Sequence, residues 1–159
     1  MIELNALLDQ SGNLILDWLK QQDMQSVPSI SANKVSEIHH IAYYLYQDQQ
    51  YEKATHFFRL LTMINPLETD YWQGLAASLQ LNKKYKEAIE SYISALLINQ
   101  NEPDPYIYVY AADCYFSLNQ VEQGLKTLEG AKTSAKQQGN KQVLNHVNFM
   151  QKLWSKNIK

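Results

Sequence analysis

The sequence has little of several residue types on which whole classes of protein depend. Cysteine occurs once in 159 residues, as Cys114, so no internal disulfide can form and a reducing compartment is expected. The five glycines and four prolines are dispersed and mark no long flexible linker. No apolar run approaches the roughly 20 residues needed to cross a bilayer. These absences favour a single folded domain over residues 1–159 that is not inserted in a membrane.

Charge of either sign is also sparse. The chain has 14 Lys and Arg against 16 Asp and Glu, a net charge of −2, so no basic excess is available to neutralise phosphates or anionic lipids. Nucleic acid and membrane are therefore not expected as partners. The first 20 residues contain Glu3 and Asp9 and lack a basic stretch followed by a continuous apolar one, so no signal peptide is expected. We expect a cytoplasmic protein.

Motifs for catalysis, cofactors and metals are missing from the sequence as well. It has no Gly-rich phosphate loop, no nucleophile elbow and no cysteine pair. The adjacent His39 and His40 would point to different sides of a helix, and with His56 they make no metal-ligand spacing. Cys114 lies beside a small residue and is expected to be a buried packing thiol. We expect no enzyme activity, no cofactor and no metal site.

What the sequence does contain is a repeat with a period near 34 residues. Small residues suit places where two helices cross closely, and large side chains fill the gaps beside them. Such a period is typical of helical hairpins duplicated in series, so the sequence predicts an all-α fold. Four columns share spacings of 34 and then 36 residues: Ala42, Ala76 and Ala112; Ala54, Ala88 and Gly124; Phe58, Tyr92 and Leu128; Leu61, Ala95 and Ala131.

These columns predict three repeats and a capping helix. Pro103 and Pro105 force a break between the second and third repeats. Residues with helical spacing near the C-terminus predict a last helix over about 140–157 that covers the third repeat, namely Val143, Val147, Met150 and Trp154. The repeats are placed at 35–68, 69–102 and 105–138, with second helices at about 51–64, 85–98 and 121–135.

The N-terminal segment 1–33 is expected to contain a further helix. Its apolar stripe follows Asn13, a good N-cap residue, and consists of Leu14, Ile15, Trp18 and Leu19. The stripe needs a partner surface, which can be either the first repeat or a second copy of the chain. The sequence does not decide between them. The segment 25–33, which contains Pro28, is the expected hinge.

The columns resemble the tetratricopeptide pattern, and the second copy matches it best, with Trp72, Leu75, Ala76, Leu79, Ala88, Tyr92 and Ala95. The resemblance implies a superhelical array whose concave side is lined by the first helix of each repeat. Side chains on these helices that the packing columns do not use are the candidate peptide contacts: His39, Tyr43, Tyr46, Gln47, Gln73, Ala77, Gln80, Tyr106, Val109, Asp113 and Phe116.

This candidate set is rich in aromatic and amide groups and contains no Lys or Arg. Tyrosine offers a large contact area and a hydroxyl, and glutamine can bond both amide and carbonyl groups of a peptide. The set suits an extended or helical apolar peptide. It disfavours the clamping of a C-terminal carboxylate, which related domains achieve with Lys, Asn and Arg. For each tyrosine, packing between hairpins is an equally good interpretation.

At finer grain the sequence resembles the class II chaperones of bacterial type III secretion. The likeness is carried by residues 11–16, 42–47 with 51–54, 70–77 with 85–89, and 102–103 with 111–115. It implies a bacterial cytoplasmic chaperone whose groove binds hydrophobic translocator proteins and keeps them soluble and apart before export. Such chaperones often form homodimers through the N-terminal helix, which gives the stripe of Leu14, Ile15, Trp18 and Leu19 a dimer contact as a second role. Gly124 stands where the family has alanine and is expected to weaken its helix by roughly 1 kcal/mol.

Three alternatives stay open. A generic tetratricopeptide scaffold would join two folded partners that are not secretion substrates. A regulatory adaptor would also engage a transcription factor. An enzyme is the least supported alternative.

Overall fold

The computed structural model describes residues 30–157, and this part of the chain contains helices and no strands. The expected N-terminal helix with its apolar stripe lies outside the described residues. The all-α prediction is confirmed. In chain order the helices are α3 Ala32–Gln47, α4 Tyr51–Ile64, α5 Thr69–Leu81, α6 Tyr85–Ile98, α7 Pro105–Ser117, α8 Val121–Gln137 and α9 Lys141–Trp154, followed by the short 3-10 helix η3 Ser155–Asn157.

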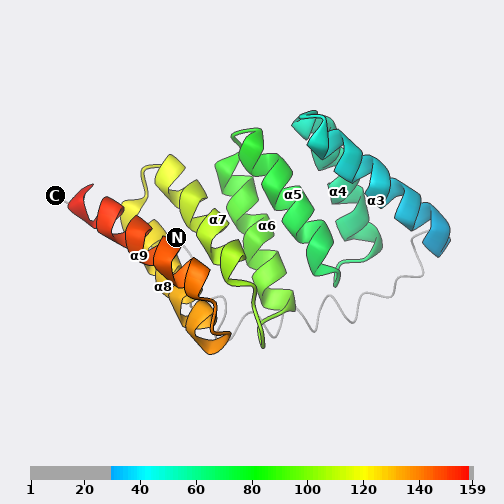
Figure 1. The fold of residues 1–159 in the computed structure, drawn as a ribbon. Coiled ribbons are helices and arrows are strands. Elements are labelled where there is room, and N and C mark those ends of the chain that lie inside the picture. Colours follow the sequence, from blue (N-terminus) through cyan, green and yellow to red (C-terminus); the bar gives the residue numbers. More distant parts are fainter. Residues whose placement is uncertain (1–29, 158–159) are drawn as a thin grey trace.

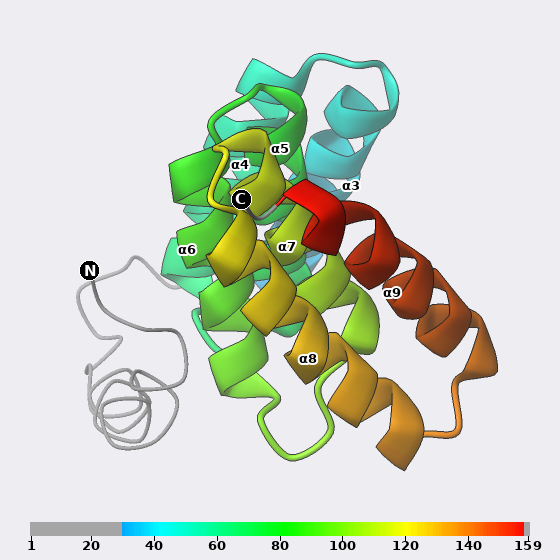
Figure 2. The same ribbon diagram turned by 90° about the vertical axis from the view of Figure 1, so that its left-hand side faces the viewer.

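Consecutive helices pair as hairpins, and the hairpins stack in two layers. Helix α3 packs with α4, α5 with α6 and α7 with α8, and we call the first member of each pair the A helix and the second the B helix. The A helices and α9 form one layer and the B helices the other (Figures 1 and 2). The array therefore runs from α3 at one end to α9 at the other.

The turn inside each hairpin has the same backbone conformation. Gln49, Lys83 and Asn119 have φ values of 60°, 60° and 59°, in the left-handed region. The next amide donates back into the A helix at 2.9 Å in all three turns, from Gln50 to Leu45, Lys84 to Leu79 and Gln120 to Tyr115. A left-handed residue with such a bond is a common way to end a helix. The backbone conformation of the turn thus repeats with the same spacing of 34 and 36 residues as the side chains of the packing columns.

All four packing columns are buried, as the repeat predicts. The small residues Ala42, Ala76 and Ala112 have no exposed surface, and Phe58 and Tyr92 are 3% and 2% exposed. The sequence predicts only that Gly124 weakens its helix, but in the structure this glycine also has a packing role. A Cβ added there would lie 2.3 Å from the Phe116 ring, so the glycine makes room for that ring.

Two apolar clusters make up the core. The first spans the first two repeats and the face of α7 that carries Ile107, Ala111 and Cys114. The second lies among α7, α8 and α9 and includes Val143 and Val147. Helix α9 begins where the Asn140 side chain accepts a hydrogen bond from the Val143 amide at 3.1 Å. It covers the last repeat, as predicted, although the helix ends at Trp154 and not at residue 157.

The proline-containing link before α7 is fixed from both sides. Pro105 is the first residue of α7, and the Asp104 carboxylate accepts a hydrogen bond from the Tyr106 amide at 2.9 Å. The carbonyl of Pro103 accepts hydrogen bonds from the side chains of Ser134 and Gln138 on α8 and just beyond it. The link therefore holds α7 at its place in the A layer.

Candidate peptide-binding surface

The A helices expose a row of polar and aromatic side chains, which we call the A-helix surface. Tyr43 is 56% exposed and Gln47 is also exposed, whereas most other members are half-buried. Half-buried side chains are held in place but still present area to a partner. The surface consists of His39, Tyr43, Tyr46, Gln47, Gln73, Ala77, Gln80, Tyr106, Tyr110 and Asp113.

Tyrosines from three helices meet on this surface. The Tyr110 ring lies 6.2 Å from Tyr106 on the same helix and 6.1 Å from Tyr92 on α6. Burial raises the pKa of Tyr46 on α3 above its usual range, and nearby Tyr51 and Tyr110 raise it further, so α3 contributes to the same group. The cluster of Tyr46, Tyr92, Tyr106 and Tyr110 therefore joins the first, second and third repeats.

Tyr110 was not among the residues predicted from the sequence, although it is 45% exposed. Its counterpart in the second repeat, 36 residues earlier, is Gly74, and in the third repeat that position carries a ring. Tyr92 was assigned to a packing column only, and its ring is indeed buried. The signal that could have indicated Tyr110 is its spacing of four residues from Tyr106 on the same helix.

One hydrogen bond fixes a glutamine of the surface. The hydroxyl of Tyr92 donates to the side-chain oxygen of Gln80 at 2.7 Å. This bond leaves the amide NH2 group of Gln80 as the donor that can face a peptide carbonyl. A B-helix residue thereby orients a polar group contributed by an A helix.

His39 lies at the seam between the first two repeats. Its ring makes edge contacts with Tyr71 at 5.1 Å and Phe58 at 6.1 Å. These aromatic contacts connect α3 with α5 and α4. His39 thus packs between hairpins while part of its surface stays exposed, which fits both roles considered for the residues of this set.

Val109 and Phe116 lie elsewhere than the sequence-based set places them. They are 2% and 6% exposed and belong to the apolar cluster under α9. The Phe116 ring stacks on Trp154, with 4.4 Å between ring centroids and an interplanar angle of 6°. The repeat register alone could not show that α9 covers these two positions, so we leave them out of the A-helix surface.

Asp113 contributes the carboxylate on this surface. Loss of hydration raises the pKa of Asp113, while the nearby His146 on α9 acts in the opposite direction. A half-buried carboxylate favours a partner that offers a hydrogen-bond donor or a cation. Asp113 therefore gives the third repeat's part of the A-helix surface a carboxylate, which the parts from the first two repeats lack.

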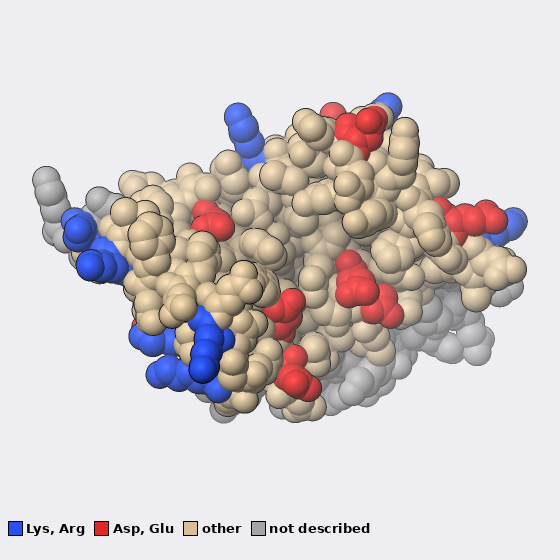
Figure 3. All heavy atoms as spheres, viewed as in Figure 1, with Lys and Arg blue, Asp and Glu red and all other residues tan. Residues whose placement is uncertain are grey.

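Few charges lie over the middle of the A layer. Figure 3 shows this face, which is largely uncharged in the middle apart from scattered acidic groups, while Lys and Arg gather mainly toward the α9 end. The described part of α9 carries Lys141 and Lys152 and no acidic residue. The A-helix surface itself has no Lys or Arg, as expected from the sequence.

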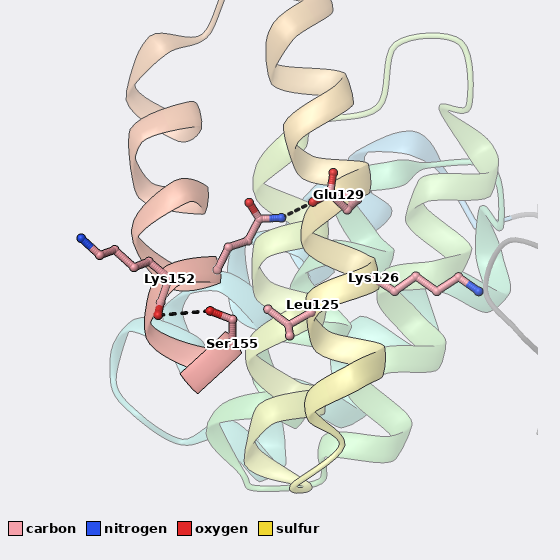
Figure 4. Close-up of a pocket in the computed structure, with 6 residues that line it drawn as sticks. Leu125, Lys126, Glu129, Lys152 and Ser155 are labelled. Carbon is pink, nitrogen blue, oxygen red and sulfur yellow. Dashed lines mark hydrogen bonds between the residues drawn. The ribbon is translucent and has the colours of Figure 1, made fainter. Parts of the chain in front are cut away.

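Two pockets among the described residues lie apart from the A-helix surface. One lies between α8 and α9 and is lined by Leu125, Lys126, Glu129, Gln151, Lys152 and Ser155 (Figure 4). Within it the Gln151 side chain donates to Glu129, and the Ser155 hydroxyl donates to the Lys152 carbonyl at 3.3 Å. These bonds join α8 to α9 and close the end of α9, so we assign the pocket a structural role.

Residues 30–157 show no arrangement of side chains typical of metal-dependent or thiol chemistry. No group of three His, Cys, Asp or Glu side chains there converges as a metal site requires. Cys114 has no exposed surface, and burial raises the pKa of its thiol to about 12, as suits a packing residue. Within the same range no helix combines the length and apolar character required to cross a bilayer.

Comparisons with known proteins agree with this architecture. A family model described as tetratricopeptide repeat matches residues 37–66 and 69–99. The chain is 26% identical over 105 residues to the chaperone protein SicA of Salmonella dublin, a match that covers 65% of this chain. The same match spans 64% of the length of SicA, somewhat less than two thirds.

Solved structures extend the likeness to the fold. PcrH of Pseudomonas aeruginosa, in complex with the chaperone binding region of PopD, superimposes with a TM-score of 0.76 at 21% identity, covering 84% of this chain and 99% of that one. The type III secretion chaperone SycD of Yersinia enterocolitica, with a peptide of the translocator YopD, gives a TM-score of 0.74 at 22% identity, covering 83% and 100%. These findings confirm the tetratricopeptide fold and the resemblance to type III secretion chaperones that the sequence predicts.

Proposed function

We propose that this tetratricopeptide-repeat protein, which resembles type III secretion chaperones in sequence and fold, is a chaperone for hydrophobic translocator proteins in the bacterial cytoplasm. Its A-helix surface would bind a short extended segment of each client. The client would thereby stay soluble and apart from other translocators before export. The protein acts by binding, and no catalytic step is required.

The observation that carries the proposal is the group of exposed and half-buried tyrosines on the A-helix surface, namely Tyr43, Tyr46, Tyr106 and Tyr110. A protein with membrane-inserting segments exposes apolar area and aggregates in water. The rings of Tyr43, Tyr106 and Tyr110 offer apolar area, while their hydroxyls and the amide of Gln80 can satisfy the polar backbone of an extended peptide. The related chaperones PcrH and SycD were crystallised with segments of PopD and YopD, which supports the same kind of client here.

Co-expression with the translocators encoded near this protein tests the proposal. We expect a translocator to co-purify with the wild-type chain, and Tyr43→Ala combined with Tyr46→Ala to lower the recovered client at least tenfold, because two central contacts are lost. Leu60→Ala with Met63→Ala is the matched control. These side chains are 40% and 66% exposed on the B helix α4, so their loss should leave binding intact.

Two results would contradict the proposal. Failure of every neighbouring translocator to co-purify would favour the generic scaffold, whose partners are not secretion substrates. Client binding that survives the double tyrosine substitution but not the α4 control would place the contact on the B layer. Circular dichroism of all variants separates loss of binding from loss of fold.

The dimer predicted through Leu14, Ile15, Trp18 and Leu19 concerns residues outside 30–157. It stays a prediction.

A further inference from the structure

The last helix exposes large apolar side chains on the side that faces away from the array. Val143, Val147 and Met150 of α9 pack in the apolar cluster with α7 and α8. At about 100° per residue along a helix, Phe149 points away from the side that these three residues share. Phe149 is 64% exposed and Leu153 is 51% exposed. Residues four apart on a helix are neighbours, so the two side chains form one apolar patch.

This patch is unusual at the end of a stacked array. Nothing packs beyond a terminal helix, so its outer face is normally polar, which keeps the protein soluble. Helix α9 lies at one end of the array, and α7 and α8 pack on its inner side (Figures 1 and 2). A contiguous exposed apolar patch in such a place suits contact with another protein.

Lysines flank the apolar patch. Lys152 and Lys156 follow Phe149 and Leu153 by three residues each, and both lysines are exposed. The one ion pair within residues 30–157 joins α4 to α6, so neither lysine has a carboxylate partner in that range. We call Phe149, Lys152, Leu153 and Lys156 the α9 outer face.

The whole end of the molecule that contains α9 is positive. Residues 126–157 contain six lysines and one carboxylate, a net charge of +5, whereas residues 30–125 contain six Lys and Arg and eleven Asp and Glu, a net charge of −5. The one carboxylate, Glu129, accepts a hydrogen bond from Gln151. Packed helices lie about 8–10 Å apart, and salt screens charge over about the same distance. A partner at α9 therefore responds mainly to the positive end.

We propose that the α9 outer face docks a short amphipathic segment of a second protein, rich in Asp and Glu. Apolar side chains of the segment cover Phe149 and Leu153, while its carboxylates meet Lys152 and Lys156. Charge complementarity therefore selects the partner, and burial of the apolar patch holds it. The α9 outer face shares no residue with the A-helix surface, so the proposal does not depend on the proposed function.

Other anionic partners fit this face less well. Segments that bind anionic lipids carry clusters of roughly four to eight Lys and Arg, whereas α9 and η3 together carry three lysines, Lys141, Lys152 and Lys156. Binding to nucleic acid depends mainly on a series of cations placed against phosphates. Here the centre of the face is apolar. An acidic protein segment matches both the patch and the charge.

A labelled synthetic peptide tests the proposal by fluorescence anisotropy with the full-length chain. The peptide has leucine on one helical face and glutamate beside it, and a matched peptide has glutamine in place of glutamate. We expect the acidic peptide to bind, and the glutamine peptide to bind at least about threefold more weakly. Lys152→Gln with Lys156→Gln should weaken the acidic peptide about three- to tenfold, since exposed ion pairs contribute modestly. Phe149→Ser with Leu153→Ser should weaken it at least about tenfold, because the buried apolar anchors are lost.

Two control variants separate this site from other parts of the molecule. Lys84→Gln with Lys86→Gln removes the same charge from exposed positions at the start of α6 and should change the affinity for the peptide less than about twofold. Tyr43→Ala with Tyr46→Ala should leave peptide binding intact even where it abolishes client binding. Failure of this proposal is thereby distinguished from failure of the proposed function.

Several results would overturn the proposal. These are no binding of the acidic peptide, equal binding of the glutamine peptide, or losses in the α9 variants no larger than in the lysine control. Loss of peptide binding in the tyrosine variant would instead place the peptide on the A-helix surface. Vesicles of phosphatidylserine and phosphatidylcholine and a DNA duplex serve as competing probes. Tighter binding of either one through Lys152 and Lys156 would make the partner a membrane or a nucleic acid. Circular dichroism of each variant confirms that it is folded.

Discussion

At the residue scale, two glycines lie directly against buried aromatic rings. Gly124 faces Phe116 as Gly74 faces Phe58, with 2.3 Å and 2.2 Å from the added Cβ to the nearest ring atom. In an ordinary helix, Gly→Ala stabilises by about 1 kcal/mol. Here both rings are buried, and Phe116 is also stacked on Trp154, so neither can move aside without disturbing neighbours.

We therefore predict that Gly124→Ala lowers the free energy of unfolding by about 1–3 kcal/mol, as expected of an overpacked core. Urea denaturation measures this. In the double variant with Phe116→Leu, the added methyl group should cost less than it does in the wild-type background, because the smaller side chain leaves room. Higher stability of Gly124→Ala alone would show that the ring contact is loose.

The buried thiol of Cys114 should make the free energy of unfolding fall at alkaline pH. Burial raises its pKa from 9.0 to about 12, so the unfolded chain loses this proton at lower pH than the folded one. Stability is therefore full below about pH 9 and falls as pH rises toward about 12. Burial raises the pKa of Tyr92 as well, which adds to the loss above pH 10.0. The midpoint of urea denaturation should fall as the pH rises from about 8 to about 11. The fall should be less steep for Cys114→Ala than for the wild type. If the urea midpoints of the wild type and of Cys114→Ala fall equally steeply with pH, a group other than Cys114 causes the pH dependence.

At the element scale, the turn between the A and B helices contains strain in two of three repeats. Gln49 and Lys83 have a φ of 60°, a conformation that costs a residue with a Cβ about 1–2 kcal/mol, whereas Asn119 tolerates it better. Glycine has no such cost, although it adds freedom to the unfolded chain.

Lys83→Gly should thus raise the free energy of unfolding by about 0.5–1 kcal/mol, the relief of strain less the entropy term. Lys84→Gly is the matched control, because Lys84 has a φ of −88° and gains nothing from glycine. Thermal denaturation of both variants measures the difference. Equal effects at the two positions would mean that the left-handed turn is not strained.

The sequence predicts the bounds of a helix well where nearby residues determine them, and less well where a contact distant in sequence does. The B helices at Tyr51–Ile64 and Tyr85–Ile98 match their predicted ranges, because small and large residues alternate at fixed distances along each repeat. Helix α8 continues to Gln137, two residues past the prediction. Its Ser134, near that end, bonds the Pro103 carbonyl, a contact 31 residues away in sequence that no local pattern reveals.

The same holds for the candidate site: the sequence predicts the features that the repeat determines, but not those that come from packing between helices. The register identifies the A-helix face, on which Tyr43 is exposed and Tyr46 and Gln80 are half-buried. That these residues contact a client stays a prediction. The register fails at α7, because α9 docks there and buries Val109 and Phe116, while Tyr110 turns toward Tyr92. Both differences come from packing between elements, which the spacing of residues within one repeat does not contain.

At the scale of the whole molecule, charge and aromatic area are separated. The clustered tyrosines come from α3, α6 and α7, whereas α9, at one end of the array, carries Lys141 and Lys152. Figure 3 shows Lys and Arg mainly toward that end. A client segment bound over the tyrosines would be held by apolar contact and by hydrogen bonds to neutral groups. Salt screens interactions between exposed charges but has little effect on contacts of this kind.

We accordingly predict that the affinity for a translocator segment changes by less than about twofold between about 50 mM and about 500 mM NaCl, over which the screening length falls several-fold. Isothermal titration with the segment identified by co-expression measures it. A clamp for a carboxylate would weaken strongly over this range, since it depends on Lys and Arg. A steep loss of affinity with salt would therefore mean that the client is held by charged groups such as Lys141 and Lys152. Lys152→Gln, which should leave binding unchanged if the tyrosines hold the client, would then weaken it.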